Sequence, residues 1–503
     1  MFSSPELYHD PEKRHQDSSS PDSGYPSHSV HTSDGLVSPS PANPALEKRV
    51  WLKLDLWILP AVTMFYFLSF LDRTNLGNAR VAGLQKDLKM SNYQYSIALT
   101  VTYIPYIIAE LPSNLLLKAV GPNLMLPTML TLWGVVTTLQ GLVTSYSGLL
   151  VARFFLGLLE GGVFPGLVLY LSFFYPRQRL QWRISIFFSA ASISGAFSGL
   201  LAFGIINMHG IGNKPGWSWI FILEGLFTVI FGLTSFFLLP RSPAHARFLS
   251  PAEKDFVVQK LKEDGTTGND EKADAFSWRE VGMAFKLPQV WMLAIVFFMD
   301  GTVLYGLAYF TPSIVAGLGY TASRAQLMSV PPFALAFVVT MVGAYVSDRF
   351  HCRGFICMFS FVLCTIGFAM FLVSPIHQIR YASLFFSIPG IYLSAPTLST
   401  WSANNAAPHT RRATAIAIGF IMTNSGGILA TWLLGALSPA PRYIVATRTL
   451  LIFSVAMFVV SGLNVWYLWD QNKRKEARRE KLESRAVEEE GLGDRSAWFK
   501  YAL

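Results

Sequence analysis

Charged residues interrupt two stretches of the sequence that are otherwise apolar. Asp72 and Arg73 are adjacent in the first stretch, and Arg153 and Glu160 lie in the second. A charged side chain near the middle of a lipid bilayer costs roughly 2.5–3.5 kcal/mol, so it is retained where it faces a hydrated cavity or neutralises another charge. These four residues therefore predict a membrane transporter with charges along its central path.

These side chains suit the binding of a carboxylate and the carriage of a proton. The guanidinium group of Arg73 can donate two parallel hydrogen bonds to a substrate carboxylate, and it keeps its charge. Asp72 and Glu160 can take up a proton when desolvated and release it when a cation approaches. Arg153 precedes Glu160 by about two helical turns, so both project from one helix face. We interpret Arg153 as the cation that neutralises Asp72 or Glu160 in one state, so that protonation frees an arginine for the substrate. The alternative is a fixed network of ion pairs between helices.

Amide and phenol side chains in other apolar stretches are further candidates for substrate binding. We assign Asn75, Tyr309 and Asn424 to the substrate site together with Arg73. Asn424 interrupts an apolar stretch within TNSGGI, where its amide could bind either the substrate or a neighbouring helix. Tyrosines also serve in packing and at membrane interfaces. The secondary candidates are Tyr66, Tyr103, Tyr305, Asn404 and Asn405.

Three further acidic residues lie in or near apolar stretches. Glu110 and Glu224 are close to the ends of predicted spans, which favours a role in anchoring helices. Asp300 lies inside a span, and the sequence assigns it no role.

The composition indicates a protein whose main solvent is lipid. Of 503 residues, 52% are hydrophobic and only 14% are charged, and the mean hydropathy is +0.38. The net charge of +9 comes from Lys and Arg scattered between apolar runs, unlike the single basic face of a protein that binds nucleic acid. No nucleophile with a base, phosphate-binding glycine loop or set of metal ligands is recognisable. We therefore expect no enzyme, no metal site and no cofactor.

Twelve apolar stretches are long enough to cross a bilayer as helices. A spanning helix needs about 20 mainly apolar residues, because the hydrocarbon core is about 30 Å thick and a helix rises about 1.5 Å per residue. The predicted spans are residues 52–82, 93–117, 124–145, 148–175, 183–208, 217–239, 289–315, 324–347, 355–374, 380–404, 413–437 and 447–470.

The predicted fold class is an all-α membrane protein with twelve transmembrane helices in two six-helix bundles. The bundles are residues 51–239 and 289–470. Between them, residues 240–288 form a central cytosolic loop, in which PAEKDFVVQKLKED predicts a short amphipathic helix capped by Ser250.

Both chain ends are predicted to be cytosolic tails. Residues 1–50, rich in Ser, Pro and His, form a disordered tail because they bury too little apolar surface to offset chain ordering. Residues 471–503 form a charged tail with helical spacing of its charges. With the N-terminus inside, most of the 40 Lys and Arg residues fall on the cytosolic side.

Several strings of the membrane region resemble the major facilitator superfamily, specifically the fungal anion:cation symporter group that includes allantoate and nicotinate permeases. The strings, in order, are FLSFLDRTNLGNARVAGL, AELPSNLLL, ARFFLGLLEGGVFPG, WSWIFILEGLFTV and LPRSPAHARFLSPAEK. The resemblance implies symport of protons with a small organic anion, such as a vitamin or nitrogen-source acid, by alternating access. It also implies a monomer in the plasma membrane. In more distant sugar-acid symporters the arginine that matches Arg73 contacts the substrate carboxylate.

A second part of the resemblance concerns gating. Asp348 and Arg349, followed by Arg353, resemble the superfamily's signature between the second and third helices of each half. The implied role is to latch the cytosolic side in one state. The corresponding first-half string, LPSNL, lacks the Asp-Arg pair, so a latch there would be built differently.

Two other functions remain open from the sequence. The same fold could export an acidic fungal metabolite instead of importing a nutrient. A membrane receptor for a nutrient would need a folded cytosolic domain larger than the central loop provides.

Overall fold

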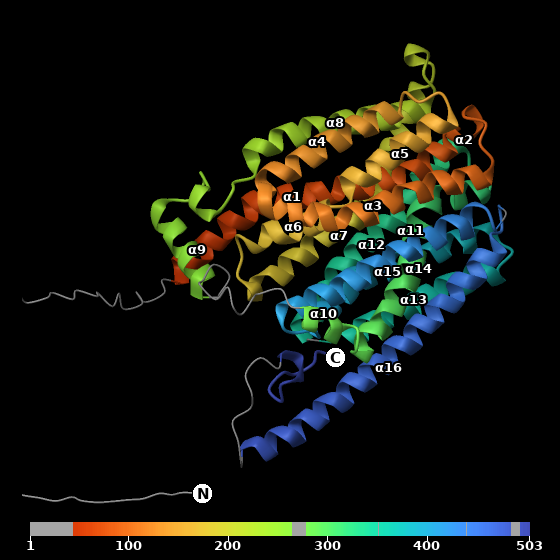
Figure 1. Cartoon of the computed structure of the whole chain (residues 1–503). Helices are drawn as coiled ribbons and strands as arrows, with labels where there is room; N and C mark the ends of the chain where they lie inside the picture. The colour runs from red at the N-terminus through yellow and green to blue at the C-terminus, as the bar shows by residue number, and fades with distance from the viewer. Residues whose placement is uncertain (1–43, 264–277, 351, 439, 484–492) are drawn as a thin grey trace, which may run out of the picture. The chain divides into compact units, whose positions relative to one another are not determined.

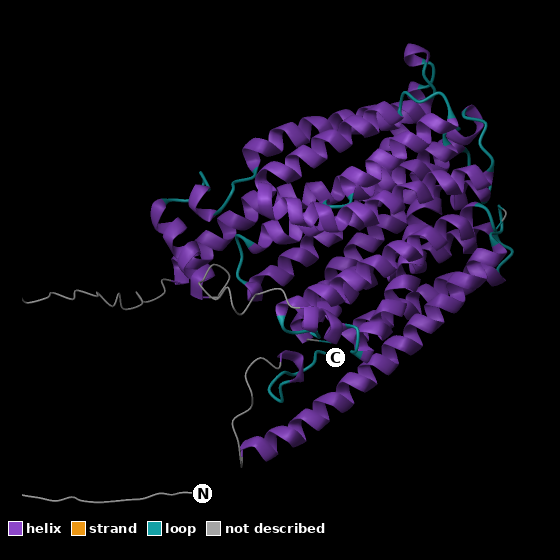
Figure 2. Cartoon of the chain, in the orientation of Figure 1, coloured by secondary structure: helices purple, strands orange, loops and turns teal. Residues whose placement is uncertain are grey.

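The computed structural model describes residues 44–263, 278–350, 352–438, 440–483 and 493–503. Within these residues the chain consists of helices joined by loops, and no strand is present (Figures 1 and 2). Residues Lys48–Leu503 form one compact unit. Most of the predicted N-terminal tail lies outside the described residues, and helix α1 begins at Pro44.

The first half of the chain forms the helices of the first six predicted spans. These are α1 (Pro44–Val81), α3 (Asn92–Val120), α4 (Pro122–Gln140), α5 (Tyr146–Glu160), α6 (Val163–Ser172), α7 (Arg177–Ile205) and α8 (Gly216–Leu238). The short helices α2 (Leu84–Asp87), η1 (Ile206–Met208) and η2 (Ile211–Asn213) lie in its loops. The fourth predicted span is therefore two helices, α5 and α6.

The second half has six long helices after a helical central segment. The central segment contains η3 (Pro243–His245), α9 (Pro251–Glu263) and α10 (Trp278–Ala284). The long helices are α11 (Pro288–Gly317), α12 (Ala322–Phe350), α13 (Arg353–Val373), α14 (His377–Asn404), α15 (His409–Gly435) and α16 (Ile444–Glu483). A single turn, η4 (Gly493–Arg495), follows.

Eight of the described helices are long and apolar enough to cross a membrane by themselves. The four predicted spans outside this set are α3, α4, α14 and the pair α5 and α6, and each of them is helical. Their polar side chains are largely covered by neighbouring helices, as on α14, where six Ser and Thr residues are buried. A helix inside an assembly therefore needs less apolar surface than a lone helix in lipid.

Glycine residues bring α5 close to α3. A Cβ atom on Gly157 would overlap the carbonyl oxygen of Thr102, and one on Gly161 would overlap that of Tyr106. This small-residue spacing lets the two backbones touch. The contact fixes the face of α5 that carries Arg153 and Glu160.

The two halves contact each other at the helix ends beside α2 and η2, which we call the closed end. Gln326 Nε2 on α12 donates a hydrogen bond to the carbonyl oxygen of Asn78 on α1 at 3.3 Å. Ser96 Oγ on α3 donates to the carbonyl oxygen of Thr431 on α15 at 3.0 Å. The opposite helix ends, beside α9 and α10, form what we call the loop end (Figure 1).

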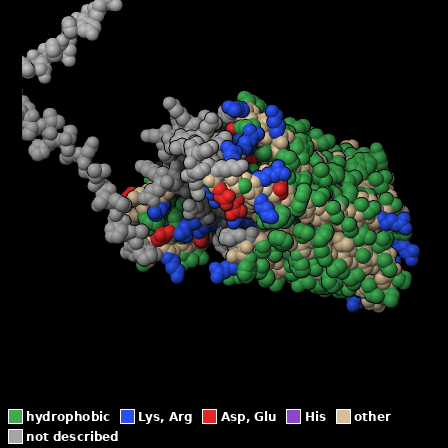
Figure 3. Space-filling model, turned by 90° about the horizontal axis from the view of Figure 1, so that it is seen from below, with side chains coloured by type: hydrophobic (Ala, Val, Ile, Leu, Met, Phe, Trp, Pro, Cys, Tyr) green, Lys and Arg blue, Asp and Glu red, His purple; other side chains and the backbone are tan. Residues whose placement is uncertain are grey.

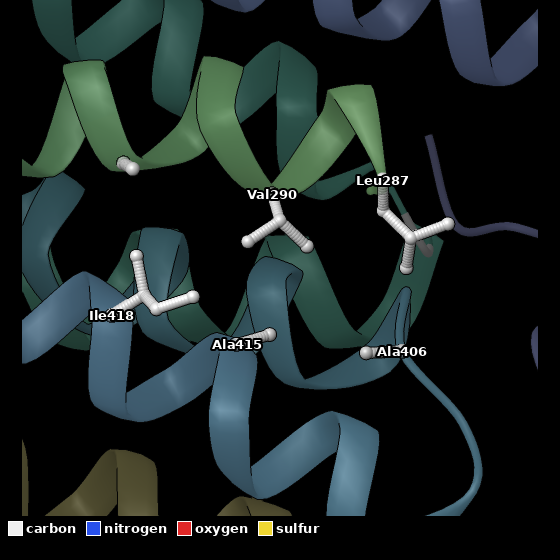
Figure 4. Close-up of a cluster of buried hydrophobic side chains, with 6 residues drawn as sticks. Leu287, Val290, Ala406, Ala415 and Ile418 are labelled. Carbon is white, nitrogen blue, oxygen red and sulfur yellow. The ribbon is translucent and has the colours of Figure 1, made fainter. Parts of the chain in front are cut away.

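The exterior and the interior follow different patterns. Seen from below, hydrophobic side chains cover most of the face, and Lys and Arg gather toward its ends (Figure 3). This arrangement suits contact with lipid chains between two polar boundaries. At the loop end α11 packs against α15 through a cluster of small and branched side chains (Figure 4): Leu287, Val290, Ala294, Ala406, Ala415 and Ile418.

The predicted amphipathic helix of the central segment is α9, and it packs on α1. Lys53 Nζ donates to both carboxylate oxygens of Glu253, at 2.7 and 2.8 Å. Ser250 caps α9 as predicted, because its hydroxyl accepts from the Glu253 amide while its own amide donates to the Glu253 carboxylate. Burial by itself would raise the pKa of Glu253, but the hydrogen bonds from Lys53 and Ser250 outweigh it and hold the pKa below its usual value.

The last eleven residues fold back on the loop end of the second half, which the sequence does not predict. The amide of Ala502 donates to Asn405 Oδ1 at 2.8 Å, and its carbonyl accepts from Trp401 Nε1 at 2.9 Å. Asp494 is fully buried and forms an ion pair with Arg411, which also pairs with Glu280 of α10 at 2.7 Å. Asn405, a secondary candidate for substrate binding, instead holds this C-terminal segment.

Candidate functional site

Arg73 and Glu160 form a buried ion pair between α1 and α5. Arg73 Nε and Nη2 both donate to Glu160 Oε1, at 3.1 and 2.8 Å. Ser69 Oγ, one turn earlier on α1, donates to the same oxygen at 2.5 Å. In this state the cation on Glu160 is therefore Arg73, while Arg153, which the sequence interpretation pairs with Asp72 or Glu160, interacts electrostatically with both carboxylates.

Arg73 also reaches the second half of the chain. Its Nη1 donates to Tyr305 Oη on α11 at 2.6 Å, and the Tyr305 hydroxyl donates to Asn424 Oδ1 on α15 at 3.4 Å. The guanidinium carbon lies 5.2 Å from the ring centroids of both Tyr106 and Tyr305, which is a cation–π distance. A chain of polar contacts thus runs from Glu160 through Arg73 and Tyr305 to Asn424.

Asp72 lies in a second group of charges inside the first half, which adjoins the Arg73–Glu160 pair because Asp72 and Arg153 both interact electrostatically with Glu160. Its Oδ2 accepts hydrogen bonds from Trp133 Nε1 and from Thr137 Oγ1 on α4, the latter at 3.2 Å. Asp72 also interacts electrostatically with Arg153 on α5 and Glu224 on α8. The adjacent residues Asp72 and Arg73 therefore contact different helices, because neighbours on a helix project about 100° apart.

Several polar atoms of this second group lack a hydrogen-bond partner among the described residues. They are Asp72 Oδ1, Arg153 Nε and Nη2, and Glu224 Oε1. All three side chains are buried. A buried charge without a partner is costly, so this group needs water, a proton or a rearranged partner.

Glu224 is the residue whose position departs most from the sequence interpretation. It lies two turns inside α8 and is buried, not anchored at a span end. The signal for this was present, since WSWIFILEGLF places an acidic residue within an apolar run. Glu224 lies so near the predicted span end that the sequence could not distinguish a helix anchor from a buried charge inside the bundle.

The other predicted substrate ligands have different surroundings. Asn75 Oδ1 accepts from Ser198 Oγ on α7 at 3.1 Å, so Asn75 joins two helices of the first half. The Tyr103 hydroxyl donates to the Tyr309 hydroxyl at 3.2 Å, toward the closed end. Of the predicted ligands, Arg73 and Asn424 are thus joined through Tyr305, while Asn75 and Tyr309 make separate contacts.

A small cavity lies between the halves beside the Arg73 group. Phe70 and Tyr305, which contact Arg73, line it together with Tyr66, Phe188 and Asp300. Its volume is about 40 Å³ for the centres of water molecules, which is room for a few waters. Toward the loop end the rings of Phe164 and Phe420 lie 4.5 Å apart between their centroids. The site is therefore closed around a space too small for a substrate.

The predicted gating residues lie at the loop end of α12 and α13. Arg349 is exposed, and the side chain of Asp348 lies outside the described residues. Arg353 is buried, and its Nη1 donates to the carbonyl oxygen of Thr400 on α14 at 3.4 Å. Arg353 thus has a contact within the second half.

The described residues contain no group of three or more His, Cys, Asp or Glu side chains placed to hold a metal ion. Cys352, Cys357 and Cys364 are free thiols. The chemistry available at the site is therefore that of carboxylates, guanidinium groups, phenols and amides.

Comparison with known proteins covers most of the chain. Residues 62–431 match the family model of the Major Facilitator Superfamily. An uncharacterized transporter of Schizosaccharomyces pombe is 35% identical over 452 residues, which are 90% of this chain and 89% of that protein. A high-affinity nicotinic acid transporter of Saccharomyces cerevisiae is 33% identical over 473 residues, which are 93% of this chain and 87% of that protein.

Solved structures share the fold. A D-xylose–proton symporter has a TM-score of 0.63 at 14% identity, covering 80% of this chain and 97% of that chain. A bacterial homologue of the human lysosomal transporter Spinster, inward-facing and unoccupied, has a TM-score of 0.63 at 16% identity, covering 81% and 95%. The predicted all-α membrane fold is confirmed, and the relatives are transporters rather than enzymes. The chain is a multi-pass membrane transporter that belongs to the major facilitator superfamily.

Proposed function

We propose that this transporter couples the movement of protons to that of a small organic anion by alternating access. The observation that carries the proposal is the buried Arg73–Glu160 pair, which is joined through Tyr305 to the second half at the edge of the cavity. An arginine in that position can exchange one carboxylate partner for another. The nicotinic acid transporter among the relatives supports a monocarboxylate as the substrate class.

Protonation of Glu160 is the step that would free Arg73. At present the donors of Arg73 are used by Glu160 Oε1 and Tyr305 Oη. A proton on Glu160 removes its negative charge, so the guanidinium fork can take the substrate carboxylate in its place. Tyr305 and Asn424 would then contact the same substrate from the second half, and the bound molecule would link both halves.

The balance of buried charges also favours proton binding. In the middle of the described spans two buried arginines, Arg73 and Arg153, face four buried carboxylates. An excess of negative charge in an apolar interior is unfavourable, and adding an anionic substrate increases it. Protons that enter with the substrate offset this excess. The carboxylates are Asp72, Glu160, Glu224 and Asp300.

The orientation follows from the predicted topology. For a monomer in the plasma membrane with both termini in the cytosol, the closed end faces outward and the loop end inward. Asp348, Arg349 and Arg353 would then latch the cytosolic side. Symport of one proton with one monoanion moves no net charge, so the pH gradient alone would drive it.

Uptake into proteoliposomes that contain the full chain tests the proposal. Labelled nicotinate is the first probe, followed by a panel of other small carboxylates, with and without an imposed pH gradient and a protonophore. Arg73→Ala should lower uptake by about 100-fold or more, because a charge-assisted contact worth about 3 kcal/mol is lost. Arg80→Lys, two turns further along α1 and outside the cavity, is the matched control. Carboxylate uptake that is unchanged both without the pH gradient and in Arg73→Ala would contradict the proposal.

A further inference from the structure

Asp300 on α11 is a buried carboxylate that contributes to the charge balance of the proposed cycle but has no step of its own in it. It is 1% exposed and lines the cavity between the halves. Its Oδ1 accepts a hydrogen bond from Ser394 Oγ on α14 at 2.5 Å. No Lys, Arg or His of the described residues forms an ion pair with it. Its surroundings therefore supply one neutral donor and no cation.

A carboxylate in this position needs a further partner. One hydrogen bond from a hydroxyl does not offset the cost of removing an acidic group from water. The rest of the cavity lining is apolar or aromatic, including Phe297 and Leu304, apart from Ser399 and Thr423, whose hydroxyls donate to backbone carbonyls of their own helices. The open side of Asp300 faces the cavity, so a water molecule, a proton or a bound molecule can supply the missing donor.

Asp300 lines the same cavity as Phe70 and Tyr305, the two residues through which Arg73 adjoins it. Tyr305, which accepts a hydrogen bond from Arg73, lines the cavity with Asp300. Asp300 and Tyr305 are five residues apart on α11, which is about 7.5 Å along the helix axis at about 1.5 Å rise per residue. A small molecule with a carboxylate at one end can reach Arg73 and still place its other end near Asp300.

We infer that Asp300 recognises a protonated nitrogen on the substrate, so that the transported class is a carboxylate that also carries an ammonium or pyridinium N–H group. This inference rests on the proposed transport of a carboxylate at Arg73. It makes the site two-ended, with a cation for the carboxylate in the first half and an anion for the nitrogen in the second. A substrate of this kind adds no net negative charge to an interior that already has an excess of carboxylates.

Matched pairs of competitors test this inference in proteoliposomes. Each pair has similar size and differs in its nitrogen: nicotinate with benzoate, and 4-aminobutanoate with pentanoate. In the wild-type chain we expect the nitrogen-bearing member of the better-bound pair to compete at least about tenfold more strongly, because a polar site rejects an analogue that leaves its groups unpaired. Asp300→Asn keeps the side-chain volume and should reduce this preference to about twofold or less.

Two further variants separate the inference from other roles of Asp300. Asp300→Glu restores the charge and should restore part of the preference, which a role in packing alone would not predict. Arg73→Ala should weaken both members of each pair equally. Protein amount and thermal stability in detergent are measured for every variant, so that a folding defect is recognised.

The outcomes are distinct. No preference in the wild-type chain, or an unchanged preference in Asp300→Asn, overturns the inference and leaves the transport of carboxylates intact. Loss of the pH dependence in Asp300→Asn with the preference unchanged also overturns it, because Asp300 would then carry a proton instead of contacting the substrate. If no carboxylate of either kind competes, the proposed function itself fails.

Discussion

The two halves of the membrane region place their buried charges differently. In the first half, Asp72, Arg73, Arg153, Glu160 and Glu224 lie in the middle of the spans. In the described part of the second half, the corresponding depth holds Asp300 with neutral side chains such as Tyr305 and Asn424. The buried ion pair of that half, Arg411 with Asp494, lies at its loop end instead.

This difference suits a division of tasks between the two halves. Exchangeable ion pairs in the first half suit the binding and release of a proton, because protonation changes which partner an arginine takes. Phenol and amide groups in the second half suit the positioning of a substrate without a change in charge. The fixed ion pair at the loop end suits stability, because both of its members are fully enclosed.

The largest effect should come from removing the exchangeable charge of the first half. Glu160→Gln keeps the shape of the side chain but cannot lose a proton, so Arg73 is permanently available for substrate. We expect proton-driven accumulation to fall by about 100-fold, since a carboxylate that alternates between two states is lost. Exchange of labelled for unlabelled substrate across the membrane should persist.

The comparison of accumulation with exchange in the same proteoliposomes checks this prediction. Ser69→Ala removes a neutral donor to the same carboxylate and serves as the matched control. If Glu160→Gln accumulates substrate like the wild-type chain, then proton coupling does not depend on the first-half pair.

A stability effect without a transport effect should follow from breaking the ion pair of the second half. Asp494→Ala leaves Arg411 buried beside Glu280 alone, and breaking a buried pair costs about 3–5 kcal/mol. The thermal midpoint in detergent should fall, while the substrate concentration for half-maximal uptake stays the same. Glu480→Gln removes an exposed charge of α16 and should leave the midpoint unchanged. A changed substrate affinity in Asp494→Ala would show that the C-terminal segment acts on the site.

The smallest effect should come from the contact that holds α9 on α1. Glu253→Gln keeps the capping arrangement with Ser250 but removes the ion pair with Lys53, so it should cost less than about 1 kcal/mol at neutral pH. The pKa of Glu253 is lower in the folded chain than in an unfolded one. Its contribution is therefore present above the usual glutamate pKa and is lost as the pH falls through the lower folded value.

Thermal midpoints measured from pH 7 down to about pH 3 check this order. The difference between the wild-type chain and Glu253→Gln should shrink as the pH decreases. A difference that grows in acid would mean that the carboxylate is not stabilised by Lys53.

The apolar stretches of the sequence predicted the helices well, because each span is set by local length and composition. The pattern also predicted that Arg153 and Glu160 share a buried face, which α5 confirms. The break between α5 and α6 was not predicted, since the glycines at 161 and 162 are also compatible with a continuous membrane helix.

The sequence by itself determined that Asp72, Arg73, Arg153 and Glu160 enter the apolar interior, because a run of hydrophobic neighbours fixes the depth of a side chain. Only the tertiary structure decided their partners: Arg73 binds Glu160, and Asp72 binds Trp133 and Thr137. It also decided that Glu224 is buried. It likewise decided that the C-terminal residues pack on the α14–α15 loop. The partners depend on which helix faces pack against each other, and contacts between residues far apart in the sequence determine that packing.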